Sequence, residues 1–321
     1  MLSMAKIVVT DPAFGVVTDS ITRLQEAGHE LVRTPFPVPE QELLPYLPAA
    51  SAIVSGPDRI GRQALEAAPQ LRLISRFGVG LDNIDVTEAT RRGVIVTNAV
   101  GANADAVADF TILLMLALSR EFCRAAVLVR QGRWELCRGV EIWGKTLGVV
   151  GTGQIGRRVI ARAGGFAMKI LAHDTVQDSS LVERHGVRYV ELEELLRGSD
   201  YVTLHVPRLP TTFGLIGEQQ LGLIKPSAFL INTARGGIVD EEALCRALKA
   251  RRIAGAALDV FAQEPPPPSE LLQLDNLIAT SHIASSTDEA MHNVDTNCLQ
   301  NVLAVLGGGQ PLTPVNYPFP K

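Results

Sequence analysis

The chain has 321 residues, about twice the length of a typical domain, so we expect two domains that each bury a core. Apolar residues make up 46% and charged residues 20%, which is typical of a soluble globular protein. The formal net charge of −4 argues against a nucleic-acid-binding protein, which would carry a basic stripe. The longest largely apolar run, residues 110–118, is too short to cross a bilayer, and the N-terminal residues lack the apolar core of a signal peptide. We therefore expect no membrane partner.

The cysteines show no metal-ligand or disulfide pattern. No CxxC pair and no Cys/His cluster occurs among Cys123, Cys137, Cys245 and Cys298. This favours free thiols in a reducing compartment, so the sequence predicts a cytoplasmic protein without a bound metal.

Short β-branched runs alternate with helical stretches through the first hundred residues. One helical stretch, residues 21–28, ends at Gly28, a residue typical of the position after a helix. Strands separated by helices predict a doubly wound parallel sheet. The five predicted strands span residues 6–10, 29–34, 51–56, 71–76 and 94–98.

An apolar helix is predicted over residues 104–119, and the alternation then resumes. The prolines at 265–268 mark a loop, because proline continues neither a helix nor a central strand. The pattern predicts a second doubly wound α/β unit. Its strands are expected at residues 146–151, 169–174, 201–206, 228–234, 255–261 and 276–282.

A glycine motif follows the strand at 146–151 and precedes a helical stretch. In this context Gly151 permits the tight turn, Gly153 admits a pyrophosphate and Gly156 lets the helix pack on the strand. Asp174 ends the next strand, where a carboxylate accepts hydrogen bonds from an adenosine ribose. The arrangement favours an NAD-binding site. The alternative is a glycine turn without a ligand, next to a solvated aspartate. Because residues 175–177 include no cation, the arrangement also favours NAD over NADP.

Three polar side chains follow strands of the second unit. Arg235, Glu264 and His282 come after the predicted strands at 228–234, 255–261 and 276–282. Ligands of open parallel sheets bind outside the carboxyl ends of the strands, so these groups are candidates for chemistry on an anionic carbonyl compound. Arginine would bind the carboxylate, histidine would transfer a proton, and glutamate would orient the imidazole.

Each of these residues also has a purely structural interpretation. Glu264 alone would be a solvated loop residue, His282 an interior histidine and Arg235 an ion-pair partner. His205 also ends a strand, so position alone leaves it as a second candidate histidine.

In the first unit, the strand at 71–76 leads into a loop with glycines at 78 and 80. Glycines let backbone amides face a ligand, so the loop is a candidate cradle for a carboxylate and otherwise a tight turn.

The ordered motifs together resemble the D-isomer-specific 2-hydroxyacid dehydrogenases, in particular phosphoglycerate dehydrogenases without a regulatory tail. The likeness runs through RFGVGLDNID, VADFTILLMLALSR, GKTLGVVGTGQIG, HVPRLPTTFGLIG, NTARGGIVDEEAL, AALDVFAQEP and SHIASST. It implies an NAD-dependent hydride transfer between a D-2-hydroxy acid and a 2-oxo acid, of hydroxypyruvate/glyoxylate or 3-phosphoglycerate type.

The resemblance assigns roles residue by residue. Arg235, Glu264 and His282 are implied to be catalytic, and Arg76, Val79 and Gly80 to bind the substrate. Cofactor contacts are implied for Thr111, Gly151, Gly153, Gln154, Ile155, Gly156, Asp174, Pro207, Thr233 and Asp259.

The resemblance also implies a discontinuous domain layout. A flavodoxin-like substrate domain is expected over residues 1–101 and 290–321, with a Rossmann NAD-binding domain inserted at 102–289. Family members are commonly homodimers joined through the cofactor domain near the helix at 104–119.

Two departures from the family pattern bear on substrate and cofactor. Asp109 and Phe110 stand where many relatives have a glutamate and a histidine, near the nicotinamide. Ser55 and Gly56 stand where phosphoglycerate-specific relatives often carry an arginine for the phosphate, although arginines follow at 59 and 62. We therefore expect small unphosphorylated substrates to be reduced at least as well as 3-phosphohydroxypyruvate.

Two alternative interpretations share this fold. One is an NAD-sensing protein that resembles the C-terminal-binding-protein corepressors and has little turnover. The other is a formate dehydrogenase, which would have a longer N-terminal extension and different polar groups at its active site.

Overall fold

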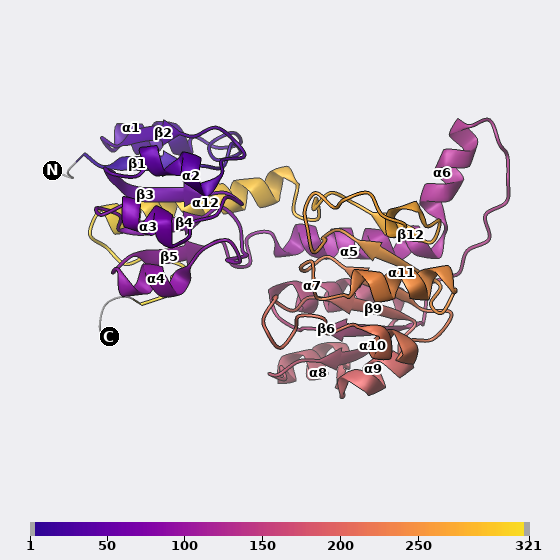
Figure 1. The fold of residues 1–321 in the computed structure, drawn as a ribbon. Coiled ribbons are helices and arrows are strands. Elements are labelled where there is room, and N and C mark those ends of the chain that lie inside the picture. Colours follow the sequence, from indigo (N-terminus) through magenta and orange to yellow (C-terminus); the bar gives the residue numbers. More distant parts are fainter. Residues whose placement is uncertain (1–3, 318–321) are drawn as a thin grey trace. The chain divides into compact units, whose positions relative to one another are not determined.

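The computed structural model describes residues 4–317, which form two compact α/β units. Unit 1 contains the chain up to Asn103 and again from Ser286, and unit 2 contains Ala104–Ser285. Each unit is built around one parallel sheet (Figure 1), which confirms the predicted fold class. Among the described residues, no helix is long and apolar enough to span a membrane.

Unit 1 has a five-stranded sheet in the order β2-β1-β3-β4-β5. The strands are β1 (Lys6–Val9), β2 (Glu30–Arg33), β3 (Ala50–Ser55), β4 (Leu73–Arg76) and β5 (Ile95–Asn98). The helices are α1 (Ser20–Glu26), α2 (Glu40–Leu43), the 3-10 helix η1 (Leu44–Tyr46), α3 (Arg62–Ala67), α4 (Val86–Arg91) and the C-terminal α12 (Asp288–Leu306).

Helices cover both faces of this sheet. On one face α1 and α12 pack with Leu24, Leu299 and Val302 against the inner strands. On the other, α2, α3 and α4 contribute Leu43, Leu65 and other apolar residues. Burial on both faces explains why the strands are almost continuously apolar. It also explains why the C-terminal helix belongs to unit 1, because its buried face completes one of the two cores.

Unit 2 has a seven-stranded parallel sheet in the order β12-β11-β10-β9-β6-β7-β8. The strands are β6 (Thr146–Val150), β7 (Lys169–His173), β8 (Arg188–Tyr189), β9 (Tyr201–Leu204), β10 (Phe229–Asn232), β11 (Gly255–Leu258) and β12 (Leu277–Ala279). The helices are α5 (Ala104–Ser119), α6 (Phe122–Arg130), α7 (Gln154–Ala163), α8 (Ser179–His185), α9 (Leu192–Gly198), α10 (Glu218–Leu223) and α11 (Glu241–Lys249), with the 3-10 helices η2 (Gly164–Phe166) and η3 (Leu271–Gln273).

The strand order places a switch point beside β6. The chain runs from β6 to β7 and β8 on one side, and then returns to β9 on the other side. Helices α5, α7 and α8 cover one face of the sheet, and α9, α10 and α11 cover the other. Ligands of such sheets bind at the carboxyl ends of the strands next to this switch point. The fold therefore directs attention to the loops that follow β6, β7 and β9 to β12.

Candidate active site

The loop after β6 has the geometry of a phosphate cradle. Gly151 has a φ of 93°, and a Cβ atom there would lie 2.8 Å from the carbonyl carbon of His205. A Cβ atom on Gly156 would overlap the carbonyl oxygen of Gly151, so the first turn of α7 packs directly on the loop. Around Gly153 there is open space, and no side chain caps the start of α7. The uncapped amides of Gln154 and its neighbours can therefore bind a pyrophosphate.

Asp174 follows β7 and binds the glycine loop. Its Oδ2 accepts hydrogen bonds from the amide and the hydroxyl of Thr152, at 2.6 and 3.0 Å, and its Oδ1 accepts one from the amide of Val176 at 3.2 Å. Burial raises the pKa of this carboxyl, but these hydrogen bonds outweigh burial and hold the pKa below its ordinary value. Asp174 is therefore an anion at neutral pH, beside the phosphate cradle.

The remaining candidate cofactor residues lie in unit 2, most of them just after its strands. Ile155 is in the first turn of α7, Pro207 follows β9 and Thr233 follows β10. The Thr233 hydroxyl lies 3.1 Å from that of Thr111, which is on α5. Asp259 is fully buried, and its carboxylate accepts hydrogen bonds from the Thr280 hydroxyl at 2.6 Å and from the amides of residues 283 and 284 at 2.9 Å.

Arg235, Glu264 and His282 follow three neighbouring strands. The strands β10, β11 and β12 pair in parallel, so their carboxyl ends lie at one edge of the sheet. A Cβ atom on Gly236 would overlap the carbonyl oxygen of Phe261, which packs the turn after Arg235 onto the loop after β11. The Phe261 amide in turn donates to Glu264 Oε1 at 3.0 Å. Close backbone packing therefore joins the arginine turn to the glutamate loop.

His282 and Glu264 form a direct pair. His282 Nδ1 lies 2.8 Å from Glu264 Oε2, and their side chains are 47% and 37% exposed. The His282 amide donates to the carbonyl oxygen of Asp259 at 2.9 Å, and the residue has a φ of 56°, in the left-handed region that is uncommon for residues other than glycine. The pair leaves Nε2 of the imidazole as the nitrogen that can exchange a proton with a ligand.

The other strand-ending histidine has a different environment. The Nε2 of His205 lies 3.0 Å from the Thr203 hydroxyl, and its Nδ1 is buried with no hydrogen-bond partner among residues 4–317. Burial lowers the pKa of His205 to about 3, so its imidazole is neutral at any working pH. Of the two candidates, only His282 has a carboxylate partner and an exposed ring.

In unit 1, Arg76 organises the glycine loop after β4. Its Nε donates to the carbonyl oxygen of Gly80 at 3.0 Å, and its Nη1 donates to those of Ser55, at 3.1 Å, and Phe77. The Asn98 amide group donates to the carbonyl oxygen of Val79 at 2.8 Å. Within the described part of the chain, the backbone amides of Val79 and Gly80 have no hydrogen-bond partner. The side chains thus hold the loop by its carbonyl groups and leave two amides available to a ligand.

Positions 55 and 56, at the end of β3, carry a serine and a glycine and no arginine. The nearest charged side chain to Gly56 is the acidic Asp11. Ser55 is buried, and a Cβ atom on Gly56 would lie 3.0 Å from Oδ2 of Asp11. Arg59 and Arg62 are 79% and 69% exposed, and each lies 3.6 Å from a glutamate, Glu40 and Glu66 respectively.

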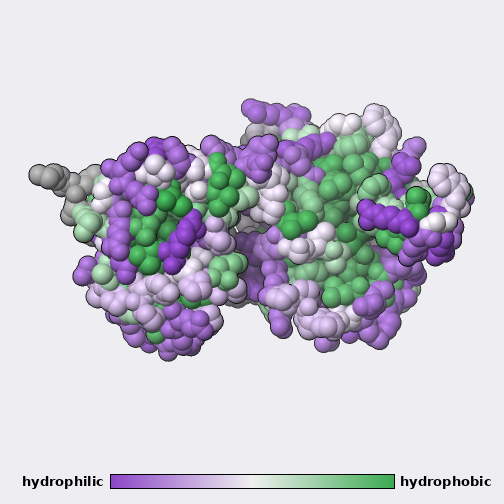
Figure 2. Space-filling view, turned by 90° about the horizontal axis from the view of Figure 1, so that it is seen from above, coloured by the Kyte–Doolittle hydropathy of each residue, from purple (hydrophilic) through white to green (hydrophobic). Residues whose placement is uncertain are grey.

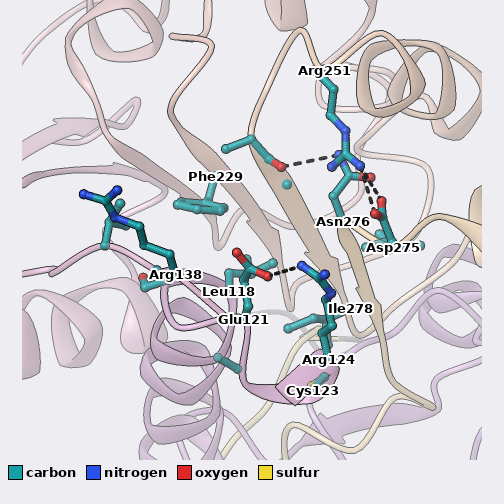
Figure 3. A pocket seen from close by; sticks show the side chains of 17 residues that line it. Leu118, Glu121, Cys123, Arg124, Arg138, Phe229, Arg251, Asp275, Asn276 and Ile278 are labelled. Atoms are coloured by element: carbon teal, nitrogen blue, oxygen red, sulfur yellow. Dashed lines mark hydrogen bonds and ion pairs between the residues drawn. The ribbon is translucent and has the colours of Figure 1, made fainter. Parts of the chain in front are cut away.

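A separate cavity of about 310 Å³ lies at the other edge of the unit 2 sheet. It is lined by the first residues of β10, β11 and β12, and Figure 3 shows two ion pairs there, Arg124 with Glu121 and Arg251 with Asp275. The cavity is thus at the amino ends of these strands, whereas His282 and its partner lie at the carboxyl ends.

Comparisons with known proteins identify the family of this chain. Residues 112–284 match the family model described as D-isomer specific 2-hydroxyacid dehydrogenase, NAD binding domain. A glyoxylate reductase of Korarchaeum cryptofilum is 43% identical over 271 residues, which cover 82% of each chain. The chain belongs to the D-isomer specific 2-hydroxyacid dehydrogenase family. This is a family of NAD(P)-dependent oxidoreductases, and unit 2 contains its NAD-binding domain.

Other members of this 2-hydroxyacid dehydrogenase family are similar over more of the chain. A D-3-phosphoglycerate dehydrogenase of Methanocaldococcus jannaschii is 42% identical over 98% of this chain, which spans only 60% of that relative. The crystal structure of a glyoxylate reductase from Paecilomyes thermophila has a TM-score of 0.89 and 30% identity, covering 98% of this chain and 99% of that one.

Proposed function

We propose that this protein is an NAD-dependent reductase of small, unphosphorylated 2-oxo acids such as hydroxypyruvate and glyoxylate. The observation that carries the proposal is the 2.8 Å contact between His282 Nδ1 and Glu264 Oε2, at the same sheet edge as a phosphate-binding glycine loop. An imidazole held by a carboxylate is suited to deliver a proton to a carbonyl oxygen.

The catalytic roles follow from the chemistry of each side chain. Bound NADH would supply the hydride. His282 donates the proton to the carbonyl oxygen of the oxo acid, and Glu264 orients its imidazole and stabilises the protonated ring. Arg235, at the end of β10, binds the substrate carboxylate and polarises the adjacent carbonyl.

The residues that would hold the cofactor all belong to unit 2. The amides of the loop and of the first turn of α7 bind the pyrophosphate, and Asp174 binds the adenosine ribose. Asp174 is anionic, so it repels the 2′-phosphate of NADP and favours NAD. The set is Gly151, Gly153, Gln154, Ile155, Gly156, Asp174, Pro207, Thr233 and Asp259, with Thr111 near the nicotinamide.

We also assign a substrate-binding role to the backbone amides of Val79 and Gly80 in unit 1. Backbone amides held in a glycine-rich turn make a concave anion site. Arg76 supports this site indirectly, because its guanidinium binds the carbonyl groups of the loop.

The acidic environment after β3 supports the preference for unphosphorylated substrates. The Asp11 carboxyl lies against Gly56, so a phosphate in this region would meet an acidic side chain. Ser55 and Gly56 supply no side chain that could give a phosphate the roughly 1.5 to 3 kcal/mol that hydrogen bonds to charged groups contribute.

The test is a kinetic screen of the purified full chain with NADH. Oxidation of NADH is followed with hydroxypyruvate, glyoxylate, phenylpyruvate and 3-phosphohydroxypyruvate at one ionic strength, because phosphate recognition is sensitive to salt. We expect kcat/KM for hydroxypyruvate or glyoxylate to equal or exceed that for the phosphorylated substrate. A phosphorylated substrate favoured by about tenfold or more, with the advantage lost in Arg59→Ala or Arg62→Ala, would overturn the substrate assignment.

We also propose that the protein is a cytoplasmic homodimer joined through unit 2. Exposed apolar side chains follow one another along α5, α6 and the next segment, and Trp134 and Leu136 are 94% and 93% exposed. Figure 2 shows a broad hydrophobic area on unit 2, the part at the right. A second copy would cover such a surface, and the free cysteines fit a reducing compartment.

Light scattering of the wild-type protein should give twice the mass of the chain. The variant Trp134→Ser/Leu136→Ser should give the mass of one chain. A monomeric wild-type protein would contradict the assignment.

A further inference from the structure

Tyr189, on the two-residue strand β8, connects two segments beside the candidate cofactor site. Its hydroxyl accepts a hydrogen bond from the amide of Asp178 at 3.0 Å and donates one to the hydroxyl of Thr152, also at 3.0 Å. Thr152 lies between Gly151 and Gly153 in the phosphate-binding loop. A tyrosine 37 residues away in sequence thus contacts the centre of that loop.

The Asp174 carboxylate, which can only accept, sets the direction of each of these hydrogen bonds. The Thr152 hydroxyl donates its only proton to Asp174 Oδ2 at 3.0 Å, so toward Tyr189 it can only accept. Tyr189 therefore donates its proton to Thr152. It accepts from the amide of Asp178, because a backbone N–H group can only donate. The bonds run in one direction from an amide through two hydroxyls to a carboxylate, an arrangement in which each bond strengthens the next.

This chain of hydrogen bonds fixes the glycine loop and the Asp174 side chain, the two parts of the proposed cofactor site. Glycine has the greatest backbone freedom, so a loop with glycines on both sides of Thr152 is costly to order. Tyr189 holds the Thr152 side chain from one side and Asp174 holds it from the other. The same bonds engage Oδ2 of Asp174. Its Oδ1 accepts longer hydrogen bonds, from the amide of Val176 at 3.2 Å and the hydroxyl of Thr175 at 3.3 Å, and is the oxygen that we assign to the ribose.

We propose that Tyr189 is a positioning residue for NAD, which orders the phosphate loop through Thr152 before the cofactor binds. The proposal rests on the proposed function, since it concerns the cofactor of that reaction. Tyr189 itself contacts loop residues, and its effect is on cofactor affinity and not on the proton or hydride transfer.

The test is the dissociation constant of NADH, measured by fluorescence titration of the full chain in the absence of substrate. Tyr189→Phe removes one hydroxyl and should weaken NADH binding by about two- to tenfold, the effect of one hydrogen bond, while kcat at saturating NADH stays close to that of the wild type. The matched control is Tyr201→Phe. The Tyr201 hydroxyl lies 2.7 Å from that of Ser119, so this variant also loses a tyrosine hydrogen bond, but at the start of β9 and away from the loop. It should keep the wild-type affinity for NADH.

A double-mutant cycle separates positioning from general stability. Thr152→Val removes the central hydroxyl at nearly constant volume, and it should weaken NADH binding on its own. Adding Tyr189→Phe to Thr152→Val should then have little further effect, because the two hydroxyls act through the same chain of bonds.

The outcomes distinguish this inference from the proposed function. If the wild-type protein binds no NADH, the proposed function fails. If the wild type binds NADH and Tyr189→Phe binds it equally well, or if the two substitutions have additive effects, the positioning role is wrong. A lower melting temperature with an unchanged dissociation constant would likewise assign Tyr189 a structural role alone.

Discussion

The His282–Glu264 pair of unit 2 and Arg76 of unit 1 use their charges in opposite ways at the carboxyl edges of the two sheets. In unit 2, the imidazole of His282 and the carboxylate of Glu264 bind each other and remain partly exposed. In unit 1, the guanidinium of Arg76 donates to three main-chain carbonyl groups of its own and the neighbouring loop. The first arrangement presents side chains that can transfer a proton. The second uses a side chain to shape a backbone that can bind an anion.

A charged residue at a strand end need not face the ligand. The partners of each group indicate its role better than its position does. We therefore expect substitutions of His282 to change the rate of the chemical step and substitutions of the glycine loop of unit 2 to change the binding of NADH. Substitutions of Arg76 in unit 1 should change the affinity for the oxo acid.

The largest effect is expected for His282→Ala. It removes the proton donor, and positioned acid–base groups contribute about 10²- to 10⁴-fold to rate, so kcat should fall by such a factor. Steady-state turnover of hydroxypyruvate measures the loss, and a direct titration should show unchanged NADH affinity. The matched variant His205→Gln should keep most of the activity, because His205 is neutral and buried at Nδ1. A greater loss for His205→Gln than for His282→Ala would mean that the acid–base assignment is wrong.

The next effect concerns the choice between NAD and NADP. Repulsion between the Asp174 carboxylate and a 2′-phosphate costs several kcal/mol, so kcat/KM should favour NADH by roughly a hundredfold. Asp174→Asn keeps a hydrogen-bond acceptor but removes the charge, and should reduce this preference to about tenfold or less. Since the pKa of Asp174 is held below its ordinary value, the preference should persist from neutral pH into the mildly acidic range. Equal efficiency of the wild-type protein with NADH and NADPH would contradict the role of Asp174.

A smaller effect is expected in unit 1. Arg76→Lys keeps the charge but loses the planar fork that reaches several carbonyl oxygens at once. The glycine loop should lose order, and KM for the oxo acid should rise by about tenfold, the value of one or two hydrogen bonds to a charged group. Titration with NADH gives the control. A change in NADH affinity at an unchanged KM would break the proposed division of roles between the units.

The smallest effect is expected for Glu264→Gln. The variant keeps a hydrogen-bond acceptor beside His282 Nδ1 but replaces a charge-assisted hydrogen bond with a neutral one, which is about half as strong. The imidazole is then held less firmly, and kcat for hydroxypyruvate should fall by about threefold to tenfold. Steady-state turnover measures the loss. A kcat equal to that of the wild type would refute the pairing.

Much of the fold could be predicted from the sequence because the strands of a two-sided parallel sheet are almost continuously apolar. The helix over residues 104–119 and the strands of both units have this strong local signal. Strand β8 was missed, since Arg188–Tyr189 is too short to show any periodicity. The role of Tyr189 could not be predicted for the same reason, because a single tyrosine outside a recognisable strand carries almost no sequence signal.

The candidate site was predictable in composition but not in its contacts. Strand ends located both His205 and His282, yet burial and the carboxylate partner that distinguish them depend on the tertiary fold. Asp174 was predicted to face a ribose, and its two bonds to Thr152 were not foreseen, because they join residues on different loops. The hydrogen bonds of Arg76 to the glycine loop likewise have no sequence signature.

A double-mutant cycle on His282 and Glu264, with kcat for hydroxypyruvate reduction as the readout, measures whether the two side chains act as one unit. Groups that act as a unit have strongly non-additive effects on rate. If Glu264 acts only through the imidazole of His282, then Glu264→Gln should lower kcat in the wild-type background and cause almost no further loss in His282→Ala. Equal losses from Glu264→Gln in both backgrounds would show that the two residues act independently, and would contradict the account.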